Sequence, residues 1–152
     1  MYQKSMKKKL FRSLLLLPAL FASLALAHSG VKDRNVMARM MLMSNMASNM
    51  KVIGKMAKAT AQFDKDQAEG ALLEIARLAK ETPAAFEKQA TDPKSEAKAE
   101  IWTEFDDFKT ISETLRSDAT SLAGSLSTAQ DLRPALIKLS QSCKGCHSRY
   151  RE

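Results

Sequence analysis

The chain has 152 residues, of which 45% are hydrophobic and 27% are charged, so it can bury one compact core and is neither disordered nor collagen-like. Its formal net charge of +7 would favour a nucleic-acid partner if the basic residues were spread over the folded domain. They are not, because several of them lie at the very start of the chain.

The N-terminal segment has the three parts of a secretory signal. Five basic residues precede an apolar run from Leu14 to Leu26, and the small residues Ala25 and Ala27 form a cleavage site. A membrane anchor is the alternative, but an anchor needs roughly 20 apolar residues and usually lacks such a site. We therefore expect residues 1–27 to be cleaved on export to the periplasm, leaving 28–152 as one domain without a stable membrane anchor.

Removal of this segment changes the charge of the protein. It carries five of the 24 basic residues and none of the 17 acidic ones, so 19 basic and 17 acidic residues remain and the net charge is +2. A nearly neutral domain does not favour binding to nucleic acid, and we expect none.

Two helices are expected in the first half of the domain. From Val31 to about Thr60 there is no proline, and apolar or small residues recur at steps of three and four. A second helix is expected to follow Asp64 as N-cap and to stop at Pro83. The expected buried faces are Met40, Met43, Ala47, Met50 and Gly54 in the first helix, and Leu72, Ile75, Ala76 and Ala79 in the second.

Two more helices are expected in the second half. After a loop of about ten residues, a third helix is expected to start near Asp92-Pro93 and to fade around Gly124. Ser127 or Thr128 is expected to cap a last helix that reaches Tyr150, with Leu132, Leu136, Ile137, Leu139 and Cys143 facing inwards. Four helices with short connections and no strand predict an all-α, antiparallel four-helix bundle with both chain ends at one end.

The last helix carries the motif with the clearest chemistry, Cys143-Lys144-Gly145-Cys146-His147. On a helical turn the two sulfurs share one face, and the imidazole lies four residues after the first of them. Each thiol can bond to one haem vinyl group while His147 meets the iron, so C-x-x-C-H predicts one covalent haem c near the C-terminal helix.

Other uses of the two cysteines are a disulfide loop or a metal site. Thioredoxin-like chemistry needs the pair at the start of a helix after a strand, and here the pair ends a helix. Structural zinc needs four ligands, and beside the motif the domain offers only His28 near its start. Haem attachment is therefore the leading interpretation, with disulfide or metal use as the alternatives.

The C-terminal Cys143-Lys144-Gly145-Cys146-His147-Ser148-Arg149-Tyr150-Arg151, together with the signal and the four helices, resembles the class II c-type cytochromes, the cytochrome c′ family. The resemblance covers nearly the whole domain and includes an Arg-x-x-x-Met pattern at Arg39 and Met43 in the first helix. It implies a distal iron site beside Met43, with Arg39 and Arg151 as haem propionate or proximal contacts.

In this family the residue four after the arginine implies the function. Methionine there can bind the iron opposite His147, and His/Met ligation raises the reduction potential and suits an electron carrier. This carrier function is the main expectation. The alternative is a five-coordinate iron that binds nitric oxide or carbon monoxide, and Met40 or Met46 could replace Met43 as ligand in another register.

The methionine cluster permits further interpretations. Seven methionines crowd the first helix, and most of them are expected simply to fill core space. A soft thioether site for Cu(I) is a less favoured third function. The cluster consists of Met37, Met40, Met41, Met43, Met46, Met50 and Met56.

Enzymatic catalysis is not expected, because the domain has no phosphate loop and no histidine beyond His147 and the terminal His28. The expected partners are a redox donor and a redox acceptor that the sequence does not identify. Relatives of this fold often form antiparallel dimers through the first two helices, so a homodimer is a further expectation.

Overall fold

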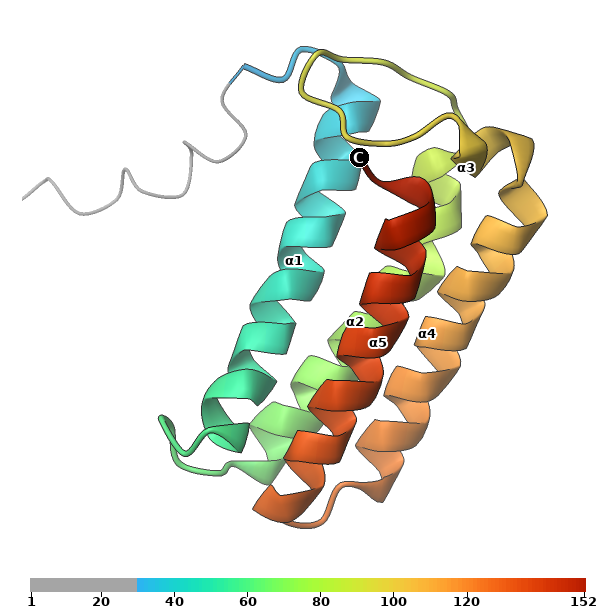
Figure 1. Cartoon of the computed structure of the whole chain (residues 1–152). Coiled ribbons are helices and arrows are strands. Elements are labelled where there is room, and N and C mark those ends of the chain that lie inside the picture. The colour runs from blue at the N-terminus through green and yellow to red at the C-terminus, as the bar shows by residue number, and fades with distance from the viewer. Residues whose placement is uncertain (1–29) are drawn as a thin grey trace, which may run out of the picture.

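The computed structural model describes residues 30–152, so the expected signal and its cleavage site lie outside the described residues. Within these residues, four long helices lie side by side and are joined at alternate ends (Figure 1). The C-terminus lies at the same end as the start of the first helix. The prediction of an all-α, antiparallel four-helix bundle is confirmed. No helix within residues 30–152 combines the length and apolar character needed to cross a membrane.

Helix α1 (Arg34–Ala57) begins after Asp33, whose carboxylate accepts hydrogen bonds from the backbone N–H groups of Asn35 and Val36 at 2.7 and 3.1 Å. Its buried residues recur at helical spacing: Val36, Arg39, Leu42, Met46, Ile53 and Met56. This buried face differs from the predicted one. Two residues predicted to be buried are not, since Ala47 is exposed and Met40 is only half-buried. With methionines on several sides of the helix, periodicity could not select the buried side.

Helix α2 (Lys65–Phe86) starts as predicted, with the Asp64 carboxylate accepting from Gln67 N at 3.0 Å. The predicted stop at Pro83 is wrong, because the helix continues for three more residues. Proline lacks the N–H that would bond to the carbonyl of Ala79. That carbonyl instead accepts a hydrogen bond from the buried Ser112 hydroxyl of the neighbouring helix at 2.7 Å, which lets the helix run through the proline.

The predicted third helix starts later than expected. Residues 87–99 form the loop between α2 and α3, followed by the short helix α3 (Glu100–Thr103) and the long helix α4 (Phe105–Ser125). Asp92 caps no helix there, because its carboxylate accepts from the N–H groups of Lys32 and Asp33 at 2.7 and 3.1 Å. These bonds tie the loop to the segment that enters α1.

The last helix follows a 3₁₀ turn, η1 (Ala129–Asp131), which Thr128 and Asp131 close through a capping box. Helix α5 (Leu132–Tyr150) then buries Leu132, Ala135 and Leu139. Ile137 was predicted to face inwards but is 51% exposed, since it lies on the side of the helix away from those residues.

The core divides into three clusters along the bundle. One contains Ile53, Met56, Leu72, Leu132 and Leu139 among others, and the middle one contains Leu42, Met46, Leu78 and Ala79. The third, which we call the aromatic cluster, consists of Phe86, Ile101, Phe108 and Tyr150. Of the predicted site residues, Met43 and Cys146 pack against the aromatic cluster, and Arg39 lies over its Phe86 ring.

Candidate functional site

The predicted motif lies within the last turns of α5. Cys143, Cys146 and His147 are all half-buried, and both cysteines are free thiols. Lys144 and Gly145 between them are exposed, and a Cβ added at Gly145 would meet no atom within 4 Å. The helix therefore turns both sulfurs and the imidazole toward the protein while the two intervening residues face outwards.

Cys146 packs against the aromatic cluster. The Phe108 ring lies at the centre of this cluster, with its centroid 5.1 Å from that of Phe86 and 5.4 Å from that of Tyr150. Met43 of α1 packs against the same cluster and also against the middle one. The structure thus brings Met43 and Cys146 of the motif to the same apolar cluster, although they are about 100 residues apart in sequence.

Burial controls the protonation of the motif. It raises the pKa of both thiols, and the charge of Cys143 raises the pKa of Cys146 further. Burial also lowers the pKa of His147, and the nearby positive charge of Arg151 lowers it more, while Glu96 opposes this. At neutral pH the imidazole is therefore uncharged, which is the form that binds a metal.

Arg39 lies near these residues, but the hydrogen-bond donors of its guanidinium are bonded to other groups of the protein. Its side chain is 3% exposed, and its guanidinium donates to the carbonyls of Ala85 at 3.0 Å, Ala90 at 3.3 Å and Lys88. Its Cζ also lies over the rings of Phe86 and Trp102, 4.7 and 5.2 Å from their centroids. Arg39 therefore holds the end of α2 and the loop that follows, a function that sequence reasoning did not foresee.

Arg151 is exposed at the end of the chain and forms an ion pair with Glu96. Backbone bonds join the two segments, since Lys98 N donates to Tyr150 O and Glu152 N donates to Glu96 O, both at 3.0 Å. Sequence reasoning missed Glu96, because it lies in a loop with no helical period and 55 residues from its partner.

The remaining predicted ligands are spread around α1. Met46 is buried in the middle cluster, Met37 and Met40 are half-buried, and Met41 is 52% exposed. Within residues 30–152, no three His, Cys, Asp or Glu side chains come together in a group that could hold a metal ion.

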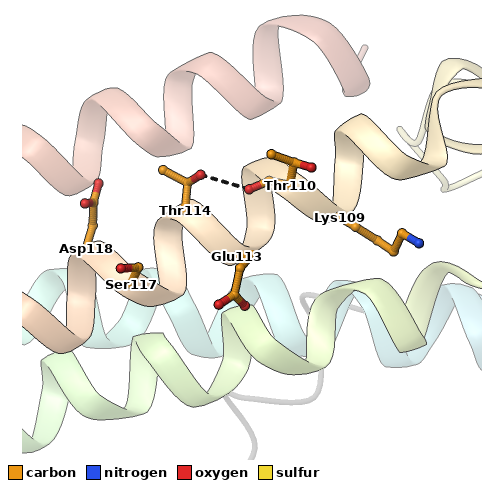
Figure 2. Close-up of a pocket in the computed structure, with 6 residues that line it drawn as sticks. All are labelled: Lys109, Thr110, Glu113, Thr114, Ser117 and Asp118. Carbon is orange, nitrogen blue, oxygen red and sulfur yellow. Dashed lines mark hydrogen bonds between the residues drawn. The ribbon is translucent and has the colours of Figure 1, made fainter.

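A shallow surface groove lies elsewhere, along the flank of α4. Figure 2 shows its side chains in a row on that one helix, where the Thr114 hydroxyl donates to the carbonyl of Thr110 at 2.9 Å. The lining residues are Lys109, Thr110, Glu113, Thr114, Ser117 and Asp118. None of them belongs to the predicted site.

Comparison with known proteins agrees with the resemblance seen in the sequence. A family model described as Cytochrome C' matches residues 34–151. The chain is 35% identical over 109 residues to cytochrome c' of Pararhodospirillum photometricum, covering 68% of this chain and 85% of that protein. It is 29% identical over 147 residues to cytochrome c-556 of Agrobacterium fabrum, covering 96% and 97%.

A solved structure shows the same fold. The nitric oxide complex of a mutant of cytochrome c prime from Alcaligenes xylosoxidans superimposes with a TM-score of 0.67 and 25% sequence identity, covering 78% of this chain and 94% of that one. The family proteins bind one covalent haem c.

The residues present here fit such a group. Two free thiols and an uncharged imidazole lie on one half-buried face of α5, and Cys146 adjoins an apolar cluster that would exclude water from a porphyrin. The match over residues 34–151 and this donor set lead to one conclusion: the chain belongs to the cytochrome c′ family of class II c-type cytochromes.

Proposed function

We propose that Cys143 and Cys146 hold one haem c through thioether bonds and that His147 is an axial ligand of its iron. The observation that supports this most directly is the common half-buried face of α5, from which the two free thiols and the uncharged imidazole emerge. When bound, the haem supplies an iron centre that changes oxidation state and binds small neutral molecules. The protein holds, orients and shields that centre.

We propose further that the iron is five-coordinate and binds nitric oxide or carbon monoxide on the side facing α1. The comparisons support this alternative better than the main expectation of a His/Met electron carrier, because the matching family is described as Cytochrome C' and a similar structure holds nitric oxide.

The electron carrier remains the second candidate, on a specific observation. Met43 lies four residues after the buried Arg39 and adjoins the same aromatic cluster as Cys146, so a thioether is available near the motif. Methionine is a ligand that raises the reduction potential of haem iron. A relative that matches 96% of this chain is named cytochrome c-556 and not cytochrome c'.

The visible spectrum of the purified protein separates the two functions. Broad bands in the reduced protein that shift on addition of carbon monoxide are expected from a five-coordinate iron. Sharp bands that carbon monoxide leaves unchanged would contradict the gas-binding proposal and support ligation by Met43. Met43→Leu should then open the iron to carbon monoxide, whereas the control Met41→Leu, on the exposed side of α1, should not.

We also propose that the protein acts in the periplasm after loss of residues 1–27, exchanges electrons with a donor and an acceptor, and has no enzymatic activity of its own.

We propose in addition that the protein forms a homodimer through α1 and α2. Exposed Met41 on α1 and Leu73 on α2 support this arrangement. Light scattering of the purified protein tests this, and a monomer at all concentrations would contradict it.

A further inference from the structure

The end of α5 is joined to the loop before α3 in a fixed register. Arg151 leaves the helix in an extended conformation, with φ −125° and ψ 140°, and pairs with Ala97 in an isolated antiparallel bridge. The two backbone bonds on either side of this pair, from Lys98 to Tyr150 and from Glu152 to Glu96, leave no freedom to slip by a residue. This pairing puts the Glu96 side chain within reach of Arg151.

Within this frame Glu96 and Arg151 form an ion pair. The Nε of Arg151 donates to Glu96 Oε2 at 2.5 Å, and its Nη2 contacts the same oxygen. Both side chains are more than half exposed, so the pair contributes little to stability. Its location matters more, since Arg151 follows His147 by one helical turn and its backbone N–H donates to the carbonyl of His147 at 3.0 Å.

The two charges act on His147 in opposite directions. Of the two residues, Arg151 is bonded directly to His147 through its backbone, whereas Glu96 reaches this turn through its bonds with Arg151 and Glu152. The ion pair therefore keeps the guanidinium at the turn that carries His147. A guanidinium released from Glu96 would turn into solvent, where its field is screened.

We propose that Glu96 is a positioning residue for the haem centre: it holds the positive charge of Arg151 beside His147 and thereby raises the reduction potential of the iron. The inference rests on the proposed ligation by His147. It goes beyond the proposed function by assigning a role to an acidic side chain in the loop before α3, which is bonded to Arg151.

The sign of a change in midpoint potential tests this proposal in the haem-loaded protein. Arg151→Ala should lower the potential, because a positive charge near the iron favours the reduced state. Glu96→Ala removes a negative charge, and the loss of that charge alone would raise the potential. If Glu96 holds Arg151 in place, Glu96→Ala should instead lower the potential toward the value of Arg151→Ala.

A double variant and a matched control complete the test. In the Arg151→Ala background, Glu96→Ala has no guanidinium to release, so it should no longer lower the potential. Glu100→Ala removes an exposed carboxylate four residues further along and should leave the potential close to that of the native protein. A rise of equal size for Glu96→Ala in both backgrounds, or no shift at all, would overturn the inference.

Failure of the proposed function would look different. A purified native protein without covalent haem, or an axial ligand that survives replacement of His147, contradicts the proposed function before any potential is measured. A normal haem spectrum with the wrong sign of shift in Glu96→Ala contradicts only the role of Glu96.

Discussion

At the scale of single residues, the two motif cysteines are placed alike but need not be equivalent, because only Cys146 contacts the aromatic cluster. We expect Cys143→Ala and Cys146→Ala each to carry less covalent haem, since only one thioether bond can form, and the double variant to carry none. Haem that stays on the protein through denaturing electrophoresis is the measurement. Lys144→Ala, exposed within the same motif, is the control and should keep the haem. Covalent haem in a protein lacking both cysteines would contradict the attachment site.

Arg39 gives a prediction of stability. Replacement by methionine keeps much of the aliphatic volume but leaves three carbonyl groups without their donor. Hydrogen bonds to a charged group contribute roughly 1.5–3 kcal/mol each, and some of these carbonyls can turn to water, so we expect a loss of about 3 kcal/mol in the free energy of unfolding. Urea unfolding measures it.

The control for Arg39 lies one and a half turns earlier in the same helix. Arg34→Met changes the same side chain at an exposed position and should alter stability by less than about 0.5 kcal/mol. Equal losses in the two variants would show that the contacts of Arg39 with the loop do not stabilise the fold.

At the scale of helices, the continuation of α2 through Pro83 depends on a donor from α4. Ser112→Ala leaves the buried carbonyl of Ala79 unpaired, and we expect it to destabilise the protein by about 1–3 kcal/mol. Thermal or urea unfolding measures the change. The exposed Ser117→Ala on the same helix is the control and should have little effect.

A double variant separates the hydrogen bond from general packing. Pro83→Ala restores an N–H that can bond to the Ala79 carbonyl from within α2. Ser112→Ala should then cost less in the Pro83→Ala protein than in the native one. An unchanged cost would mean that the hydroxyl acts through packing and not by satisfying this carbonyl.

The connection between α1 and the loop 87–99 should depend on pH. Hydrogen bonds from the N–H groups of Lys94, Lys32 and Asp33 lower the pKa of Asp92 below its ordinary value of 3.8. The carboxylate therefore stabilises the folded state above pH 3.8, and this contribution is lost as the pH falls through the lowered pKa. The stability difference between the native protein and Asp92→Asn should shrink below pH 3.8. A difference that stays constant down to pH 2 would contradict this linkage, and the exposed Glu87→Gln serves as control.

At the scale of the whole molecule, export and haem attachment predict one mass. If the proposed export takes place, the purified protein should have the mass of residues 28–152 plus one haem, with His28 as its N-terminal residue. Intact-mass spectrometry measures this directly. A mass that includes residues 1–27 would contradict cleavage, and a protein mass without haem would contradict attachment.

The sequence by itself determined the parts of this protein that depend on local chemistry. Spacing at three and four residues, the Asp64 cap and the absence of strand patterns were enough to predict four helices and hence a bundle. Cys143, Cys146 and His147 could be proposed as haem-binding residues because the chemistry of haem attachment requires neighbours in sequence, so the motif is visible without a fold. The resemblance to the cytochrome c′ family rested on that same motif and is confirmed.

The tertiary structure alone decided what depends on distant partners. The Ser112 hydroxyl carries α2 past Pro83, the Asp92 carboxylate ties its loop to α1, and Arg39 is enclosed by three carbonyls. Methionines line several faces of α1, so the sequence of α1 does not show which face is buried. Packing against α2 decides this. Glu96 and Arg151 meet across 55 residues through a backbone pairing that has no periodic pattern. Such contacts form only when distant parts of the chain come together, so they cannot be predicted from the local sequence.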